Sequence, residues 1–570
     1  MNDCDNFPSL TIKKIEWNDG TDMCFNSDDI IVLVGANNVG KSRALKDIRD
    51  DLLNNSRNKI VINHIEYQNE NFDKESMLYY FKKNFTKNYQ NDYVVPVYLN
   101  HEQFYSLNEF ENISNQENRF YPVLFSFLST ESRLNMTSPI SYSNIKDKFN
   151  FNIMNKLGFD KNTIIKLNEI LLSCFDRAID VAGVEFQNSV SKLYKFGTKE
   201  EIDETINSDT RSAREKLKKL ENLNEQGDGI RSAVAILASL IANDHSLYLI
   251  DEPETFLHPP QARLLGNNIV ELSKNKQCFI STHNIDLIRG LLEKRSSRVK
   301  IIKIDRENNS NHFSFLDNNS LIKLADDRNL KYSNILNGLF YKQVVLCESE
   351  SDCKFYSAIL ESIDNKLWQD TLFCAVGGKD QFKIIASLLK KVKINYLIIA
   401  DLDLINNRQK LSDLLNSIND NMYDQISDSH DKFLNLFEDG KNTFVKKKCD
   451  IKKEINSLLI DDGEVYLSNE IAKKIKTLLK NTSSLKLLKS SGDSCLPSGE
   501  CVNNFNKVIE FLNSNNIFVV ECGELERFVK DVGLHGDEWV NEVFKKYPTM
   551  KESAYDNAKK FIRKVFKITE

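Results

Sequence analysis

Four acidic residues in the C-terminal half of the sequence follow apolar, strand-like runs and could together hold divalent cations. Glu348 comes directly after such a run, and Asp352 lies four positions further along. Asp401 and Asp403 follow another run and, at a spacing of two in an extended chain, point to the same side. Carboxylates gathered in one place repel each other unless cations neutralise them, and hard oxygen ligands select Mg²⁺ or Mn²⁺. This half of the sequence therefore predicts a metal site.

Alternating strands and helices must bring these acids together. The runs 343–347, 371–376 and 396–400 are apolar and strand-like, helical patterns separate them, and Gly-Gly-Lys at 377–379 follows the middle run. Such alternation predicts a parallel sheet, whose ligand site lies at the carboxyl ends of the strands. We therefore expect the acids at one sheet edge, although an Asp-x-Asp pattern alone would be a weak signal.

The N-terminal half carries a phosphate-binding pattern. An apolar run over 29–34 precedes the loop GANNVGKS at 35–42, and a helical pattern begins directly after it. The backbone N–H groups of such a loop cradle phosphate oxygens, Lys41 reaches the β and γ phosphates of a nucleotide, and Ser42 offers its hydroxyl to Mg²⁺. The other loop residues that we expect around the phosphates are Asn37, Asn38 and Gly40.

Two later strand ends add a pattern for nucleotide hydrolysis. Asp251 and Glu252 follow the apolar run 247–250, as in a Walker B motif, where the first carboxylate holds Mg²⁺ through water and the second polarises the attacking water. His283 ends the next apolar strand, where it could contact a γ-phosphate. A strand ending in Asp-Glu is common by chance and a lone histidine is more often structural. Both assignments therefore depend on the order of the motifs along the chain.

The segment between the loop and the Walker B motif has a mixed pattern. A turn with Gly227 and Gly229 opens an apolar helix that runs to residue 242. Further upstream, the patterns over 162–181 and 199–223 predict amphipathic helices, which we assign to a helical insertion. The segment 125–133 predicts a strand that ends in a polar turn, either beside the nucleotide or at a plain sheet edge.

Length and composition exclude several classes of protein. A chain of 570 residues allows about two to four domains, so it is neither a peptide hormone nor a lone binding module. Its formal net charge of −6 provides no global positive field, so a nucleic-acid site must be local. The longest apolar stretch, 233–242, is too short to span a bilayer, and the eleven cysteines show no paired spacing. We therefore expect a cytoplasmic protein without membrane association.

The order of phosphate loop, glycine turn, Walker B motif and histidine resembles that of the ATP-binding-cassette ATPases, in the branch of RecF-like and structural-maintenance-of-chromosomes proteins. This resemblance implies ATP and Mg²⁺ as cofactors. It also implies a sandwich of two heads, in which signature glycines of one head, here Gly227 and Gly229, cap the γ-phosphate held by the other. At least a dimer follows, with the insertion as a dimer contact. Gln226 departs from the family pattern, which has serine at that position.

The C-terminal pattern looks like a Toprim domain, the metal-dependent fold of topoisomerases, primases and certain nucleases, although Ser349 stands where Toprim usually has glycine. A head followed by Toprim in one chain resembles the OLD (overcoming lysogenization defect) family nucleases, to which the Gabija nuclease belongs. The resemblance implies an α/β protein with an ATPase head over 1–335 and a Toprim domain over 340–570. We expect helical insertions at about 145–222 in the head and 408–515 in the Toprim domain.

In the OLD family a later acidic motif and a lysine near the C-terminus complete a two-metal nuclease centre. Matched by position, Glu526 is the corresponding ligand and Glu524 an additional one. Lys551 matches the catalytic lysine, with Lys559 and Lys560 as rivals. The resemblance thus implies a metal-ligand set of Glu348, Asp352, Asp401, Asp403, Glu524 and Glu526.

The function that this resemblance implies is an ATP-regulated, divalent-metal-dependent DNA endonuclease, a homodimer or higher homo-oligomer that serves in defence against phage. A companion defence protein or a regulatory nucleic acid is a further partner that the family leaves open. The alternative is a non-nucleolytic ATPase, a RecF- or SMC-like sensor whose Toprim unit only binds DNA or nucleotides. The full set of acids favours the nuclease, because a pure binding module does not need mutually repelling carboxylates.

Overall fold

The computed structural model divides the chain into two compact units, Met1–Ile322 and Lys323–Glu570. The structure describes residues 7–54, 59–87, 90, 92–97, 101–138, 140–142, 157, 161–186, 189–206, 211–307, 310–326, 334–438, 448–459, 467–468, 470–472, 474–475, 488–489 and 491–569.

The first unit is built on a six-stranded sheet in the order β16-β15-β3-β14-β13-β8. Neighbouring strands run parallel from β15 to β8, and only the edge pair β15 and β16 is antiparallel. The strands are β3 (Ile30–Val34), β8 (Phe125–Leu128), β13 (Leu247–Asp251), β14 (Gln277–Ser281), β15 (Val299–Glu307) and β16 (Ser310–Phe315). The inner strands are continuous apolar runs because helices cover both faces of the sheet.

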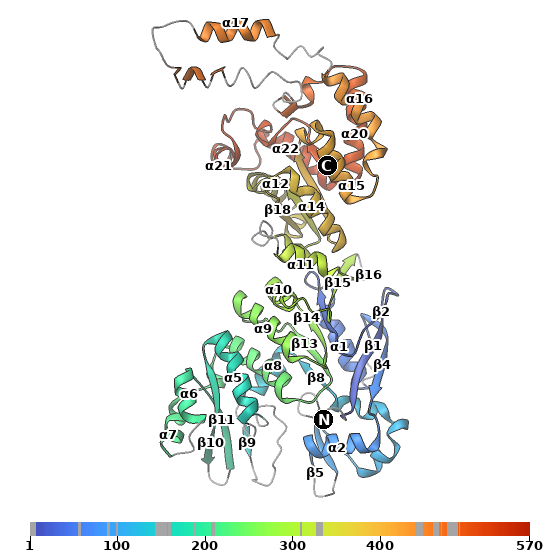
Figure 1. The fold of residues 1–570 in the computed structure, drawn as a ribbon, viewed down its shortest axis with the longest axis vertical. Helices are drawn as coiled ribbons and strands as arrows, with labels where there is room; N and C mark the ends of the chain where they lie inside the picture. The colour runs from blue at the N-terminus through green and yellow to red at the C-terminus, as the bar shows by residue number, and fades with distance from the viewer. Residues whose placement is uncertain are drawn as a thin grey trace. The chain divides into compact units, whose positions relative to one another are not determined.

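Helices follow the strands that carry the nucleotide motifs. In Figure 1, α8 and α9 lie to one side of β13 and β14, and α1 lies to the other. α8 is apolar around most of its circumference because it is buried along almost its whole length. The helices are α1 (Lys41–Leu52), α3 (Thr130–Met136), α8 (Asp228–Ala242), α9 (Pro259–Leu272) and α10 (Ile285–Glu293), and α11 (Asn318–Asp326) spans the boundary between the two units.

Two antiparallel sheets pack beside this core. β1 pairs with β2 and β4, and the Trp17 ring of β1 stacks on the Phe313 ring of β16 at 4.2 Å between centroids. A smaller sheet has the order β5-β6-β7. The elements are β1 (Ser9–Trp17), β2 (Asp22–Cys24), β4 (Ile62–Glu70), α2 (Lys74–Asn84), β5 (Thr86–Lys87), β6 (Tyr93–Val97) and β7 (His101–Tyr105).

The insertion at about 145–222 is not purely helical, which corrects the sequence-based expectation. β10 (Ala178–Phe186) and β11 (Ser189–Gly197) form an antiparallel hairpin where the sequence analysis predicted the end of a helix. The stretch 178–197 is rich in β-branched and aromatic residues, which favour a pleated strand over a helix. Short strands β9 (Ile140–Tyr142) and β12 (Glu221–Asn222) pair with β11. The helices are α5 (Lys161–Phe175), α6 (Lys199–Ile206) and α7 (Arg211–Lys219).

The second unit has a four-stranded, fully parallel sheet in the order β18-β17-β19-β20. Its strands are β17 (Gln343–Cys347), β18 (Thr371–Ala375), β19 (Tyr396–Asp401) and β20 (Ile517–Val520). Phe355 and Trp539 anchor a core in which α12, α21 and α22 pack on the sheet. The helices around the sheet are α12 (Glu350–Ile363), α13 (Asn365–Gln369), α14 (Lys379–Lys391), α21 (Gly536–Lys546) and α22 (Asp556–Phe566).

The described part of 408–515 is helical. It contains α15 (Arg408–Ile418), α16 (Ser427–Glu438), α17 (Lys448–Leu458) and α20 (Glu500–Ser514). α16 and α20 pack together, with the Phe433 and Phe505 rings 5.5 Å apart between centroids. This helical segment separates β19 from β20 in the sequence. The two strands are nevertheless neighbours in the sheet, and acids of the candidate site follow both of them.

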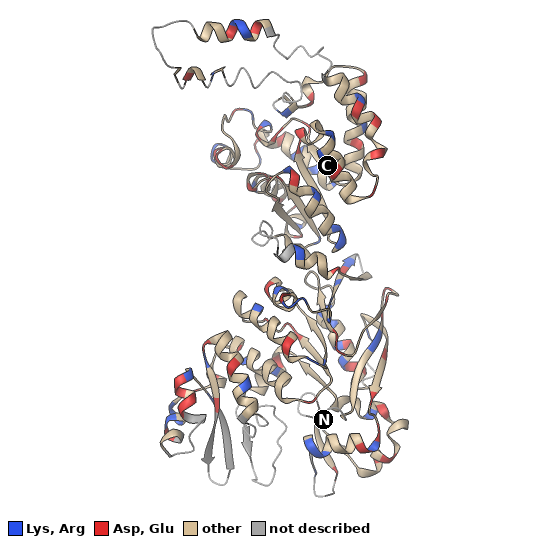
Figure 2. Ribbon diagram, viewed as in Figure 1, with Lys and Arg blue, Asp and Glu red and all other residues tan. Residues whose placement is uncertain are grey.

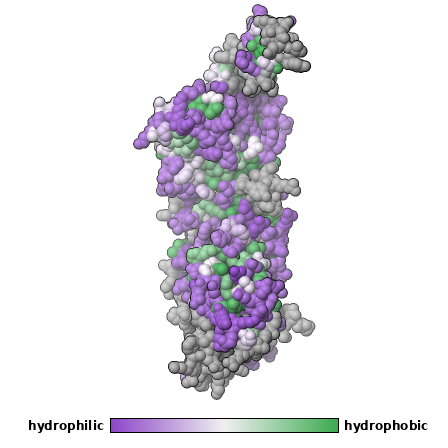
Figure 3. All heavy atoms as spheres, turned by 90° about the vertical axis from the view of Figure 1, so that its left-hand side faces the viewer, coloured by the Kyte–Doolittle hydropathy of each residue, from purple (hydrophilic) through white to green (hydrophobic). Residues whose placement is uncertain are grey.

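Acidic and basic residues are interspersed along the helices and strands of both units (Figure 2). The face shown in Figure 3 is mostly hydrophilic, with limited hydrophobic areas. Among the helices that the structure describes, none combines the length and apolar character needed to cross a membrane.

Candidate nucleotide site and candidate metal centre

The phosphate loop lies between β3 and α1, as its sequence predicted. Gly35 has no room for a side chain, because a Cβ there would lie 2.2 Å from the Ile304 carbonyl oxygen. Gly40 adopts a φ of 103° at the start of α1 and thereby turns the loop into the helix. The buried Lys41 ammonium donates to the carbonyl oxygens of Gly35 and Ala36, each at 2.8 Å, so it lies across its own loop.

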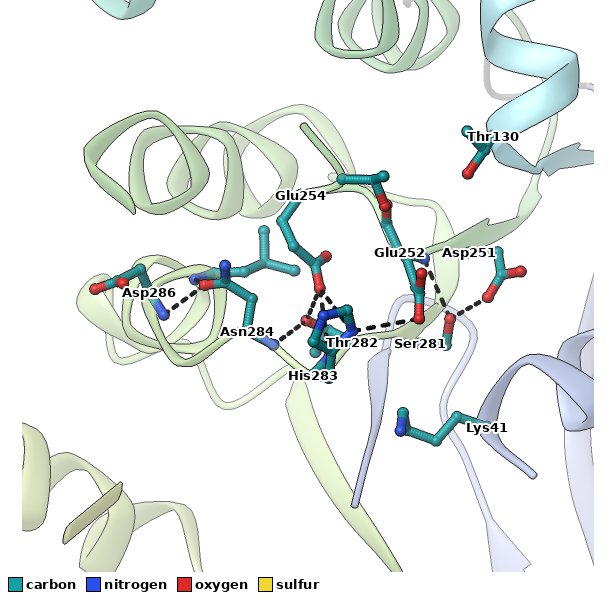
Figure 4. A network of polar contacts seen from close by, with 12 residues as sticks. Lys41, Thr130, Asp251, Glu252, Glu254, Ser281, Thr282, His283, Asn284 and Asp286 are labelled. Atoms are coloured by element: carbon teal, nitrogen blue, oxygen red, sulfur yellow. Dashed lines mark hydrogen bonds and ion pairs between the residues drawn. The ribbon is translucent and has the colours of Figure 1, made fainter. Parts of the chain in front are cut away.

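The Walker B acids and the histidine converge at the carboxyl ends of β13 and β14 (Figure 4). The Ser281 hydroxyl donates to Asp251 Oδ1 at 2.5 Å. The Glu252 backbone N–H donates to the Ser281 carbonyl at 3.0 Å, and Glu252 adopts a φ of 46°, which is unusual outside glycine. His283 Nδ1 lies 3.3 Å from Glu252 Oε1. The structure therefore brings together Asp251, Glu252 and His283, which the sequence had placed by motif order.

Glu254 is a further acid at this site that the sequence analysis missed. Its side chain is buried and accepts hydrogen bonds from the Thr282 hydroxyl at 2.6 Å and from the His283 backbone N–H at 3.3 Å. Burial raises the pKa of the Glu254 carboxyl. Its position two residues after Glu252 was the available signal, because the chain turns after the Walker B strand and both carboxylates approach His283.

The two glycines of the predicted signature turn differ in their surroundings. A Cβ on Gly227 would meet nothing within 4 Å. A Cβ on Gly229 would lie 2.4 Å from the carbonyl oxygen of Phe256, which follows the Walker B strand with a φ of 68°. Gly229 is therefore required by a contact inside this chain, whereas Gly227 leaves open space above the start of α8.

The acids of the second unit meet at the carboxyl ends of β17 and β19. Glu348, Asp401 and Asp403 each offer a carboxylate oxygen, and these oxygens lie within 4.8 Å of one another. The Asp401 backbone N–H donates to Glu348 Oε1 at 3.2 Å, which fixes the two strand ends relative to each other. Parallel neighbours in the sheet produce this convergence, since β17 pairs directly with β19.

A second group of possible ligands lies after β20. Glu524, Glu526 and His535 also offer atoms within 4.8 Å of one another. The Gly536 backbone N–H, at the start of α21, donates to Glu526 Oε1 at 2.9 Å. The sequence analysis did not include His535, whose imidazole Nδ1 lies 3.4 Å from Glu526 Oε1. No motif in the sequence marks His535, which directly precedes α21 in the structure.

Asp352 interacts electrostatically with one acid of each group, Asp401 and Glu526. Its Oδ2 accepts hydrogen bonds from the Ser349 backbone N–H and hydroxyl, each at 2.9 Å, in a capping box that starts α12. Ser349, the departure from the Toprim pattern, thus orients the acid. Burial, followed by the charge of Asp401, raises the pKa of Asp352 to about 6, and Glu526 contributes in the same direction.

Two lysines partly offset the charge of these acids. Lys379, from the Gly-Gly-Lys turn, contacts Asp403 and lies 3.8 Å from Glu348 Oε1. Lys489 Nζ lies 3.2 Å from Asp401 Oδ2 and 3.8 Å from Glu524 Oε2. Lys551 is exposed, and in the part of the chain that the structure describes no ion pair joins it to these acids. Its catalytic role therefore stays a prediction from the sequence.

Burial dominates the electrostatics of the acids. It raises the pKa of Glu348 to about 7, and the charge of Asp401 adds to the effect more than Lys379 counters it. Burial likewise raises the pKa values of Asp401 and Glu524. Ionisation of these carboxyl groups is unfavourable in the metal-free fold. They are therefore suited to a divalent cation, because a bound cation stabilises the ionised carboxylate. The residues present therefore suit one or two oxygen-preferring metal ions.

Known protein families match both units. Residues 30–289 match the family described as AAA domain, AbiEii toxin, Type IV TA system, and residues 339–403 match the family described as Overcoming lysogenization defect protein-like, TOPRIM domain. The first match contains Lys41, Asp251 and His283, and the second contains Glu348 and Asp401.

These two matches place an ATPase-type domain before an OLD-like Toprim domain in one chain. The chain is 26% identical to the Old nuclease of Escherichia phage P2 over 195 residues, 32% of this chain and 33% of that protein. It is 36% identical to an uncharacterised protein of Methanocaldococcus jannaschii over 74 residues, 12% of this chain and 63% of that protein. The matched segments thus cover about one third of the Old nuclease and less than two thirds of the Methanocaldococcus jannaschii protein.

Solved structures of ATPase heads also resemble the chain. An Smc head bound to the C-winged helix domain of ScpA is 14% identical with a TM-score of 0.34, covering 55% of this chain and 99% of that one. The SMC head domain from Thermotoga maritima is 10% identical with a TM-score of 0.27, covering 55% of this chain and 98% of that one.

The two glycines of the predicted signature turn should respond differently to a methyl group. Gly229→Ala places a Cβ against the Phe256 carbonyl, so we expect it to lower Tm by about 5 °C. Gly227→Ala meets open space, so its Tm should stay within about 1 °C of the wild type. Thermal unfolding followed by circular dichroism distinguishes the two. Equal Tm values for both variants would contradict the close approach at Gly229.

The metal-free chain should lose stability as pH rises. Glu348 ionises near its ordinary value of 4.5 in the unfolded chain but at about 7 in the fold, so stability is lost between these values. The expected loss in unfolding free energy is on the order of 3 kcal/mol. Urea unfolding in EDTA at pH 4.5 and pH 8 measures it.

Glu348→Gln is expected to weaken this pH dependence, whereas Glu361→Gln, at an exposed position of α12, should retain it. Saturating Mg²⁺ should cancel the loss in the wild type, because it binds the ionised carboxylates. An unchanged pH dependence in Glu348→Gln would show that the raised pKa belongs to another group.

Proposed function

We propose that this chain is an ATP-regulated, divalent-metal-dependent DNA endonuclease. The observation that carries the proposal is the convergence of Glu348, Asp401 and Asp403 at one sheet edge, beside a second group that contains Glu524 and Glu526. The OLD-like Toprim match and the Old nuclease of phage P2 as a relative support the choice of a nuclease.

Two metal ions of the Mg²⁺ or Mn²⁺ type fit these groups. Glu348, Asp401 and Asp403 would hold one ion, and Glu524 and Glu526 the other, while Asp352 interacts electrostatically with an acid of each group. Such ions activate water and stabilise the leaving oxygen in phosphodiester cleavage. The chain's own contribution is to hold the carboxylates in place, through the Ser349 cap and the backbone N–H groups of Asp401 and Gly536.

Lys489 is the cation that we assign to the charge developing on the phosphate, in place of Lys551. It approaches both ligand groups, since it lies near Asp401 and Glu524, whereas Lys551 is exposed. A lysine that already lies among the acids can face a phosphate held over them without a large rearrangement.

The ATPase unit would bind ATP through Asn37, Asn38, Gly40, Lys41 and Ser42, with Mg²⁺ held by Ser42 and Asp251. Glu252 would orient the attacking water and His283 would contact the γ-phosphate. The approach of His283 Nδ1 to Glu252 Oε1, at 3.3 Å, supports this assignment. The open space at Gly227 favours capping of a nucleotide by a second copy of the chain, and hence at least a homodimer.

The cellular role that we propose is antiphage defence in the cytoplasm, supported by the resemblance to the OLD family. DNA is the proposed substrate. A companion defence protein or a regulatory nucleic acid is a further partner consistent with that role.

The nuclease proposal predicts loss of nicking when the acids are neutralised. Glu348→Gln and Asp401→Asn should each lower nicking of supercoiled plasmid in Mg²⁺ or Mn²⁺ by at least about 100-fold. Asp413→Asn is the matched control, because that carboxylate contacts Lys383 and Gln409 instead, and it should nick like the wild type. Equal nicking by all four proteins would indicate a contaminating nuclease and favour a non-nucleolytic ATPase sensor.

A comparison of two lysines tests which one acts in cleavage. Lys489→Gln should lower the nicking rate at saturating metal by about 10-fold to 100-fold, because removal of one charge-stabilising group has an effect of this size. Lys551→Gln should stay within about twofold of the wild type. The reverse ranking would overturn the assignment of Lys489 and restore the one made from sequence.

A further inference from the structure

Arg133 is a charged side chain with no exposed surface in the ATPase unit. It lies on α3, the short helix that follows the edge strand β8. The sequence analysis left open whether the segment 125–133 lies beside the nucleotide or at a plain sheet edge, and β8 is indeed the edge strand. A fully buried arginine at this position needs a reason, because removing a guanidinium from water is costly unless its donors are satisfied.

Every N–H donor of this guanidinium has an acceptor. Nε donates to the Ser232 hydroxyl at 2.7 Å. One terminal nitrogen donates to the carbonyl oxygens of Leu128 at 2.7 Å and Asp251 at 2.6 Å. The other donates to the Thr130 hydroxyl at 3.2 Å and to the Glu252 carbonyl at 3.1 Å. A guanidinium has five N–H donors, so none is left for a phosphate.

Three of these five acceptors belong to the two motifs assigned to ATP, the signature helix and the Walker B segment. Ser232 lies on α8, three positions after Gly229 of the signature turn, and it is fully buried. Asp251 and Glu252 are the Walker B acids, and Arg133 holds their backbone carbonyls while their carboxylates face the site. The positive charge of Arg133 also faces the negative charges of Asp251, Glu252 and Glu254.

We propose that Arg133 is a positioning residue of the ATPase site, which ties Ser232 on the signature helix to the backbone of Asp251 and Glu252. The signature turn and the hydrolytic acids then move as one rigid group. Gly229 reinforces the link, because its Cα packs on the Phe256 carbonyl just after the Walker B acids. This inference rests on the proposed ATP hydrolysis, and Arg133 acts through Glu252 without touching the nucleotide.

Ser232→Ala removes one acceptor of Arg133 and leaves the rest of the chain intact. We expect kcat for ATP to fall about tenfold while KM stays within about twofold, because the nucleotide contacts are unchanged and only the placement of Glu252 loosens. The matched control is Ser239→Ala on the same helix. Ser239 is equally buried, but its hydroxyl faces the Met136 sulfur at 3.8 Å, so kcat should be unchanged.

Variants of Arg133 itself give a second measurement. Arg133→Lys keeps the charge with fewer donors, so its kcat should lie between those of the wild type and Arg133→Met, while KM changes little in Arg133→Lys. Equal kcat in Ser232→Ala and Ser239→Ala, or KM and Tm changing in proportion to kcat, would overturn the positioning role. If the wild-type chain turns over ATP no faster than the Glu252→Gln variant, the proposed ATPase activity is wrong. The positioning role of Arg133 is then wrong as well.

Discussion

Mutual repulsion among carboxylates is the constraint on which the rest of this structure depends. The parallel sheet of the second unit ends three of its strands in acids, and Glu348, Asp401 and Asp403 come within a metal ion's reach of each other. Partial burial makes their ionised forms costly, which the raised pKa of Glu348 reflects. A fold that only needed stability would place apolar residues here, so the arrangement is explained by the cations that it can hold.

The ATPase unit also gathers carboxylates that repel each other, and side-chain cations of the protein offset their charge. Asp251, Glu252 and Glu254 gather at parallel strand ends, and the positive charges near them are Lys41 and Arg133. Lys41 lies across its own loop, from where it can turn to a phosphate, whereas Arg133 is fixed by five hydrogen bonds. One cation thus remains available for the nucleotide and the other serves the protein framework.

The sequence was sufficient wherever a site residue directly follows a strand. Asp251, Glu348 and Asp401 stand at the end of a strand or directly after it, and parallel pairing within each sheet then determines which strand ends meet. Lys41 follows from the glycine loop that joins β3 to α1. Lys489 and Arg133 could not be predicted in this way. Lys489 comes from the far end of a long insertion, and Arg133 lies on a short helix whose partners are distant in sequence, so neither has a local pattern that marks it.

The fold shows the same division between local and distant information. The six-stranded and four-stranded sheets follow from continuous apolar runs that alternate with helical patterns. The hairpin at 178–197 was missed because its neighbours read as amphipathic helices, and the periodicity over 162–181 was extended past Phe175, where α5 ends. β-branched and aromatic residues in that stretch were the stronger signal.

Direct titration of the chain with Mn²⁺, by isothermal calorimetry in two buffers of different ionisation enthalpy at pH 6.5, tests the central claim most directly. The account predicts saturable binding with proton release, because Glu348 and Asp352 titrate near this pH in the metal-free fold and must ionise to bind a cation. Asp401→Asn should lose most of both signals. No saturable binding, or binding and proton release that are indifferent to Asp401, would contradict a shared metal centre at these strand ends.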